Sequence, residues 1–192
     1  MKFVPRIVIP VVAAMLFALP PALAQTFSPN QRHEIESIIR TDSAAPFVAG
    51  EVCEALRFAR DVLYVADNAG EIGFDSLVID LLKSMGKRVT LVVKGQTYFE
   101  DATIDDARFF GLDRTADNLV KAEGFFVPSE SSPEPREAVA RCDLVISKGT
   151  GSYDALQGEM DGKPLVFMLK VKCGPIARRM DAREGEVKIG LG

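Results

Sequence analysis

From residue 61 onward, short runs of apolar residues alternate with segments whose apolar positions recur every three or four residues. The apolar runs predict buried strands, and the spaced pattern predicts amphipathic helices. Continuous apolar strands separated by helices are typical of a parallel sheet covered on both faces. We therefore predict an α/β fold: a Rossmann-like, three-layer domain with a mostly parallel sheet and helices on both faces. Its strands are expected at residues 62–67, 88–95, 124–129, 142–149 and 164–173.

The helical patterns lie between and before these strands. Two helices, at residues 26–40 and 51–60, are expected before the first strand and are joined by a linker over residues 41–50. Ser28 as N-cap and Pro29 at the first helical position support the earlier of the two. The remaining helices are expected at residues 74–86, 103–112, 133–142, 151–160 and 174–180.

The first 24 residues have the three-part pattern of a secretory signal peptide. Lys2 and Arg6 precede an apolar run, and Ala22 and Ala24 form an A-x-A cleavage site. Prolines interrupt the run, which falls short of the roughly 18 to 20 apolar residues that a membrane span needs. We expect cleavage after Ala24, no stable membrane span afterwards, and an exported or periplasmic location if the signal is genuine.

The charge balance argues against nucleic acid as a partner. Removing the signal would take away two of the 23 Lys and Arg residues and none of the 27 Asp and Glu residues, leaving a net charge of −6. Proteins that bind nucleic acids usually present a basic surface. No nucleic-acid partner is therefore expected.

Histidine and cysteine usage limits the chemistry further. His33 is the only histidine and precedes the predicted α/β domain, which excludes a Ser-His-Asp triad and a histidine zinc site from that domain. Cys53, Cys142 and Cys173 are widely spaced, without C-x-x-C, so neither a redox pair nor a cysteine zinc site is predicted. We expect no disulfide framework; a single disulfide, of undetermined pairing, is the alternative for an exported chain. Any chemistry must come from carboxylates, amides, lysines and hydroxyls.

Polar residues recur where the predicted strands end. Asp67 and Asn68 follow the first strand, Asp101 follows the second, and Lys148 ends the fourth. The carboxyl ends of parallel strands form the edge at which ligands bind in this architecture. The alternative interpretation is that Asn68 only shapes a turn and that Asp67 caps the following helix.

The polar residues at this edge suit a hard cation and an anion. Asp67, Asn68 and Asp101 offer oxygen atoms only, which favours a divalent ion such as Mg²⁺ or Mn²⁺. Such an ion can activate water and neutralise a phosphoryl group. The glycine-rich turn GTGSYD after Lys148 could receive an anion on its N–H groups. That turn matches neither a dinucleotide fingerprint nor a P-loop, so NAD and ATP are not expected.

Four motifs together resemble the damage-control metal-dependent phosphatases, a family that also includes proteins once proposed as acidic-residue methyltransferases. The resemblance covers residues 55–186, and the motifs follow one another in the family's order and at similar spacings. They are DNAGEIGFD at 67–75, VVKGQTYFEDATIDDA at 92–107, CDLVISKGTGSYDAL at 142–156 and LKVKC at 169–173.

The resemblance implies an α/β domain that binds one divalent metal (Mn, Mg, Co or Ni) and hydrolyses phosphate esters of small metabolites, sugar phosphates among them. Asp67, Asn68 and Asp101 match the family's metal-binding positions. Asp67 and Lys148 are the implied catalytic residues. The residues implied to contact phosphate or substrate are Glu71, Lys148, Gly149 and Lys172.

Some features depart from the family pattern. Glu100 and Ser152 stand where members commonly have Asn, and the helical region that normally precedes the first motif is almost entirely missing. Activity impaired by that loss is one expectation. The alternatives are a non-catalytic metal- or anion-binding module and a protein carboxyl methyltransferase, although no glycine-rich loop follows the first strand to hold S-adenosylmethionine.

The expected organisation is a signal peptide at 1–24, a helical segment and linker at 25–52, and the α/β metal-binding domain at 53–192. The segment after the signal resembles the start of exported thioredoxin-fold oxidoreductases, without their C-x-x-C. One hypothesis is that the chain joins two unrelated pieces near residues 41–52. The α/β domain would then be cytoplasmic.

Overall fold

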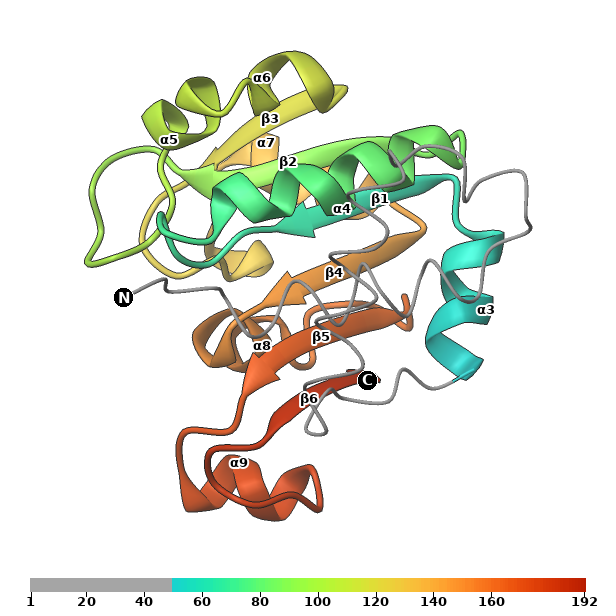
Figure 1. Ribbon diagram of the computed structural model, residues 1–192, viewed down its shortest axis with the longest axis vertical. Coiled ribbons are helices and arrows are strands. Elements are labelled where there is room, and N and C mark those ends of the chain that lie inside the picture. Colours follow the sequence, from blue (N-terminus) through green and yellow to red (C-terminus); the bar gives the residue numbers. More distant parts are fainter. Residues whose placement is uncertain (1–49) are drawn as a thin grey trace, which may run out of the picture.

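The computed structural model describes residues 50–192, which build one six-stranded sheet in the order β3-β2-β1-β4-β5-β6 (Figure 1). Five strands run parallel, and only β6 is antiparallel, to its neighbour β5. This mostly parallel sheet confirms the predicted fold class. The strands are β1 (Asp61–Val65), β2 (Arg88–Lys94), β3 (Asn118–Ala122), β4 (Leu144–Lys148), β5 (Leu165–Lys170) and β6 (Val187–Leu191).

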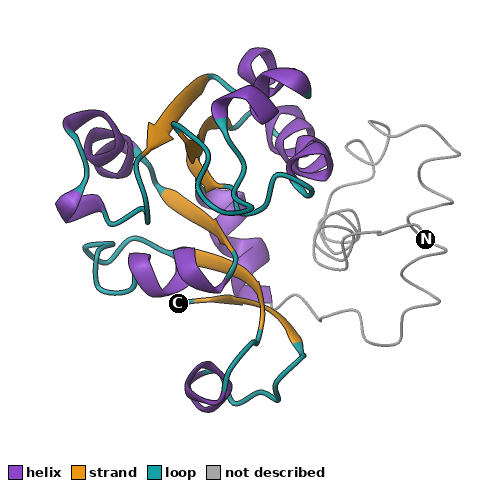
Figure 2. Cartoon of the chain, turned by 90° about the vertical axis from the view of Figure 1, so that its left-hand side faces the viewer, coloured by secondary structure: helices purple, strands orange, loops and turns teal. Residues whose placement is uncertain are grey.

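Helices cover both faces of the sheet (Figure 2). The strand residues alternate between the two resulting cores, with Tyr64 in one and Leu63 and Val65 in the other. Burial on both faces explains why these strands are continuously apolar. One face carries α3 (Gly50–Phe58), α4 (Ile72–Ser84), α5 (Ile104–Phe109) and α6 (Leu112–Thr115). The other face carries α7 (Pro133–Arg141), α8 (Thr150–Leu156) and α9 (Gly174–Arg179).

Four of the five predicted strands are confirmed, as β1, β2, β4 and β5. The strand predicted at residues 124–129 is wrong, because β3 lies earlier, at Asn118–Ala122. Only Val120 and Ala122 of β3 are buried, so this edge strand lacks the apolar run of the central strands. The apolar stretch that follows it instead turns at Gly124, with φ 62°, and enters a short 3-10 helix, η2 (Pro128–Glu130).

Two further elements differ from expectation. The helix predicted at residues 103–112 is divided into α5 and α6, because Gly111 between them adopts a left-handed φ of 74°. Strand β6 was not predicted, since its pairing depends on contacts with β5, such as Met168 opposite Ile189. The predicted signal peptide and the helix at 26–40 lie outside the described residues. Within residues 50–192, no helix is both long and apolar enough to cross a membrane.

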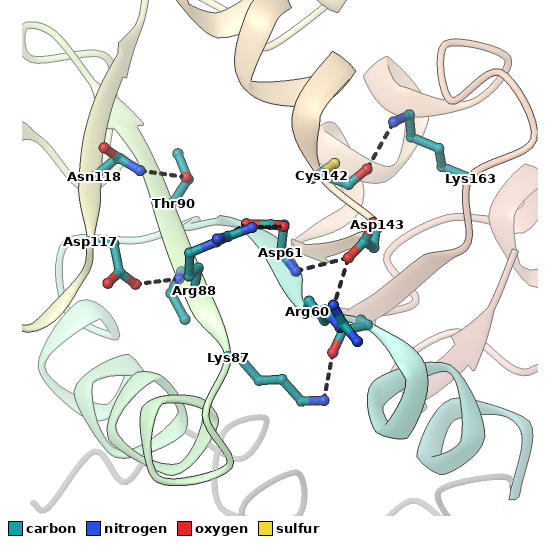
Figure 3. A network of polar contacts seen from close by, with 12 residues as sticks. Arg60, Asp61, Lys87, Arg88, Thr90, Asp117, Asn118, Cys142, Asp143 and Lys163 are labelled. Atoms are coloured by element: carbon teal, nitrogen blue, oxygen red, sulfur yellow. Dashed lines mark hydrogen bonds and ion pairs between the residues drawn. The ribbon is translucent and has the colours of Figure 1, made fainter.

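The amino-terminal edge of the sheet is held together by a polar network (Figure 3). Asp143 Oδ2 accepts hydrogen bonds from the backbone N–H groups of Arg60 and Asp61 at 2.9 and 3.0 Å. Arg88 forms an ion pair with the Asp61 carboxylate. These charged groups satisfy one another where the strands begin, so their role is structural. The residues predicted to carry chemistry lie at the opposite edge.

Candidate metal and phosphate site

The site lies where two neighbouring parallel strands, β1 and β4, end. After β1 the chain enters α4 on one face of the sheet, and after β4 it enters α8 on the other face. Connections that diverge in this way leave a crevice outside the carboxyl ends of the strands. Asp67 follows β1 and Lys148 ends β4, so both predicted residues lie at this point.

The structure brings Asp67, Asn68 and Asp101 together through backbone pairing of two loops. Asn68 and Asp101 form an isolated antiparallel bridge. Beside it, the N–H of Ala102 donates to the carbonyl of Asp67 at 2.7 Å. Asn68 Nδ2 donates to Asp67 Oδ2 at 3.1 Å, a bond that does not use the Asn68 carbonyl oxygen. Two carboxylates and an amide oxygen therefore converge at one edge of the sheet.

Asp67 lies in a strongly charged environment. Burial raises its pKa to about 6, and the negative charges of Glu71 and Asp101 contribute, while Lys148 and Lys172 act in the opposite direction. The raised pKa reflects first the loss of solvation of the carboxylate, to which the nearby negative charges add. A bound cation would relieve the repulsion. Within residues 50–192, no group of three or more Asp, Glu, His and Cys side chains is arranged to hold a metal ion, so an amide would have to complete this donor set.

Gly149 lets the Asp67 carboxylate lie directly against the turn after β4. Its φ of 79° and ψ of 160° fall in a region that is essentially restricted to glycine. A Cβ atom at this position would lie 2.2 Å from Asp67 Oδ2. The glycine is therefore required by both the backbone conformation and the close approach. This turn leads directly into α8, and the anion-binding role expected of it stays a prediction.

Lys148 is not a solvated residue, as a lysine after a strand would ordinarily be, because only 1% of its surface is exposed. Its Nζ atom contacts Glu71 Oε2 at 2.7 Å and Asp75 Oδ1 at 2.8 Å. Burial alone would lower the pKa of Lys148, but the adjacent charges of Asp75 and Glu71 raise it above the usual value. The ammonium group is thus held charged and fixed between two carboxylates.

Tyr64 and Asp75 support this lysine. Tyr64 is not among the predicted site residues, and Asp75 ends the first family motif without a predicted role. Tyr64 Oη donates to Asp75 Oδ1 at 2.9 Å, and both side chains are fully buried. Burial, followed by the charge of Asp75, raises the pKa of Tyr64 well above 10, so the phenol stays protonated as a donor. A signal was present in the sequence, since Asp75 shares the core-facing side of α4 with Ile72 and Ile79. A carboxylate on a core-facing side needs a partner.

The remaining predicted residues have different surroundings. Lys172 is exposed and lies near enough to lower the pKa of Asp67. Asp67 does not cap α4, because Glu71 is the N-cap residue. Cys53, Cys142 and Cys173 are all unpaired thiols, as expected.

Comparisons with known proteins agree with this architecture. The sequence signature of the damage-control phosphatase ARMT1-like domain matches residues 24–187. A damage-control phosphatase of Archaeoglobus fulgidus is 38% identical over 131 residues, which are 66% of this chain and 44% of that protein. The damage-control phosphatase PH1575 of Pyrococcus horikoshii is 29% identical over 163 residues, 83% of this chain and 56% of that protein. The chain thus spans about half the length of these relatives.

A crystal structure of a DUF89 family protein from Pyrococcus horikoshii shares the fold. Its TM-score is 0.71 at 24% sequence identity, over 97% of this chain and 65% of that chain. At this identity the similarity concerns the fold alone, and it confirms the predicted α/β architecture.

Proposed function

The chain belongs to the damage-control phosphatase ARMT1-like domain family, and from that premise we propose that it is a divalent-metal-dependent phosphatase. Its proposed substrates are phosphate esters of small metabolites, sugar phosphates among them. One observation supports the proposal: the paired loops bearing Asp67, Asn68 and Asp101 lie at the switch point of the sheet, where the ammonium of Lys148 is near enough to lower the pKa of Asp67. Oxygen donors beside a buried cation suit a metal and a phosphoryl group together.

The chemistry of the donor set fits a hard or borderline divalent cation. Asp67 and Asp101 would contribute carboxylate oxygens and Asn68 its carbonyl oxygen, which are the ligands that Mg²⁺ and Mn²⁺ prefer. The raised pKa of Asp67, caused by burial and by Glu71 and Asp101, supports the need for a positive charge there. A bound ion would supply Lewis-acid stabilisation of the phosphoryl oxygens and an acidified water.

Lys148 is proposed to stabilise the phosphoryl group through its remaining donor. An ammonium group has three N–H bonds, and two of those of Lys148 are directed to Glu71 and Asp75. We propose that the third donates to a phosphoryl oxygen. Lys172, exposed at the same edge, would add positive charge for an incoming phosphate. Phosphoryl transfer depends on such positioning and charge stabilisation more than on covalent chemistry.

The proposed reaction is a hydrolysis. The oxygen of a water molecule forms a new bond to phosphorus, the ester P–O bond breaks, and the departing alcohol takes a proton from that water. We assign to Asp67 the orientation of the attacking water. Removing one charge-stabilising donor from such a site lowers turnover by roughly a hundredfold or more.

The test is hydrolysis of p-nitrophenyl phosphate by the full chain with Mn²⁺, Co²⁺ or Mg²⁺ and with a chelator, alongside metal binding by calorimetry. We expect metal-dependent turnover that Asp101→Asn greatly reduces together with metal affinity. Asp105→Asn is the matched control, because its side chain is 92% exposed four residues along the same segment. Metal binding without any turnover would instead favour a non-catalytic metal-binding module.

A further inference from the structure

Three aromatic side chains, Tyr98, Phe99 and Phe125, gather beside the donor set and form what we call the aromatic wall. The Tyr98 ring packs edge-on against Phe99 at 5.0 Å and against Phe125 at 5.7 Å between centroids. Tyr98 and Phe99 lie in the loop after β2, and Phe125 lies in the loop after β3. The wall therefore joins two segments that are distant in sequence.

The aromatic wall packs against Lys94, the last residue of β2. Lys94 Nζ lies 5.4 Å from the Tyr98 ring centroid and 5.9 Å from that of Phe125. The same ammonium is 3.3 Å from Asp101 Oδ2, and Lys94 is 8% exposed. A buried cation is thus shared between the rings and a residue of the proposed metal site.

Phe125 also lies close to the first turn of α8. A Cβ atom at Gly151, in the first turn of α8, would lie 3.0 Å from Phe125 Cε1. The aromatic wall consequently extends from Asp101 to the turn that follows Lys148.

Two rings of the wall are left open to solvent at this position. Phe99 is 84% exposed and Phe125 is 58% exposed. Phe99 also adopts a left-handed φ of 49°, which is uncommon for a bulky residue. Such strained conformations cluster at active sites and ligand-binding loops. Large exposed apolar groups that border a polar site are typical of ligand-binding surfaces.

We propose that the aromatic wall is a substrate subsite, which binds a flat, unsaturated ring in the alcohol part of the phosphate ester. The inference rests on the proposed phosphatase function and narrows its substrate class. Aromatic faces stack on flat rings in offset or edge-to-face arrangements. Because Lys94 lies over two of the rings, their π density is drawn toward the cation, which favours an electron-rich flat ring over the C–H groups of a saturated ring.

The experiment compares benzyl phosphate with cyclohexylmethyl phosphate, which have the same charge, similar size and similar alkoxide leaving groups. In the wild-type chain we expect kcat/KM to be about tenfold higher for the benzyl ester, the scale of one stacked ring. Phe125→Leu keeps the apolar volume but removes the aromatic face, and it should abolish the preference. Phe58→Leu is the control, because Phe58 is also exposed, at 72%, but lies on α3, before β1.

A preference that is absent in the wild type, or that survives in Phe125→Leu, overturns the proposal. Benzylphosphonate and cyclohexylmethylphosphonate, which are not hydrolysed as esters, separate this outcome from failure of the proposed function. If no ester is hydrolysed with any metal, calorimetric binding of the two phosphonates still tests the subsite. Tighter binding of benzylphosphonate than of cyclohexylmethylphosphonate, lost in Phe125→Leu, supports it. Equal or undetectable binding of both overturns it.

Discussion

Tyr64 Oη donates a hydrogen bond of 2.9 Å to Asp75 Oδ1, although neither side chain is exposed to solvent. The same carboxylate oxygen accepts from Lys148 Nζ at 2.8 Å. The phenol of Tyr64, the penultimate residue of β1, therefore orients the carboxylate that holds the buried ammonium at the end of β4. Asp75 Oδ1 thus accepts hydrogen bonds both from the sheet core, through Tyr64, and from the candidate site, through Lys148.

Tyr64→Phe should destabilise the protein while leaving the Lys148 ion pairs in place. The substitution removes one hydrogen bond to a charged acceptor, so we expect a loss of about 1.5 to 3 kcal/mol in the free energy of unfolding. Urea unfolding followed by far-UV circular dichroism measures it. Tyr153→Phe is the control, since Tyr153 is also buried but packs its ring against Phe167 at 5.1 Å. Equal losses in the two variants would contradict a specific role for the Tyr64 hydroxyl.

Replacing Lys148 affects stability and turnover by different routes. Lys148→Met removes the cation from buried Asp75, and breaking a buried ion pair in this way costs about 3 to 5 kcal/mol. Adding Asp75→Asn removes the stranded charge, so the double variant should recover much of that stability. Metal-dependent turnover should stay lowered by roughly a hundredfold or more in the double variant, because the donor to the phosphoryl group is still missing.

Unfolding curves and phosphatase assays on both variants separate the two roles. A double variant with recovered stability and full turnover would show that Lys148 serves the structure alone. A solvated lysine, by contrast, would leave both measurements unchanged.

The position of the candidate site, at the carboxyl edge of the sheet, could be predicted from the sequence. Apolar runs mark β1, β2 and β4, and polar residues lie at the end of each. Parallel strands place their carboxyl ends together, which brought Asp67 and Asp101 to one side without knowledge of side-chain positions. The Tyr64–Asp75 contact could not be predicted in the same way. It depends on which side of α4 packs on β1, and tertiary packing sets that orientation.

The errors in the fold have a related cause. Strand β3 exposes Asn118 and Lys121, and its position is set by pairing with β2 rather than by an apolar run. Local pattern instead favoured the stretch that contains Phe125, whose ring is exposed in the aromatic wall. The apolar pattern around Phe125 predicts a buried strand, but the Phe125 side chain is exposed.

The stability of the metal-free protein should fall as the pH rises from 4 to 6, in part because of Asp67. Burial, with the charge of Glu71, raises the Asp67 pKa from 3.8 to about 6 in the folded state. Between these values the folded state holds a proton that the unfolded chain has released, so the stabilisation is complete below the unfolded pKa and is lost through the folded one. The contribution is roughly 2 to 3 kcal/mol.

Denaturant unfolding with a chelator at several pH values tests this, and Asp67→Asn provides the comparison. The difference between the wild-type and variant profiles isolates this one carboxylate from other titrating groups. Parallel profiles would show that Asp67 has an ordinary pKa in the folded protein.

Gly149→Ala should reduce metal affinity, although Gly149 offers no side chain to a metal. A Cβ atom at position 149 would lie 2.2 Å from Asp67 Oδ2, so the carboxylate would have to move away from the donor set. Gly158→Ala is the matched control, because Gly158 has the same φ of 79° but nothing within 4 Å of an added Cβ. A positive φ costs a non-glycine residue about 1 to 2 kcal/mol, and both variants should lose at least that much free energy of unfolding.

Only Gly149→Ala should also weaken Mn²⁺ binding, by about tenfold or more, the scale of disturbing a group that orients a metal ligand. Calorimetric Mn²⁺ titration of the two variants at pH 7 measures the difference. If Gly149→Ala bound Mn²⁺ as tightly as Gly158→Ala does, the position of the Asp67 carboxylate against this turn would be irrelevant to the metal, and Asp67 would lose its assignment as a ligand.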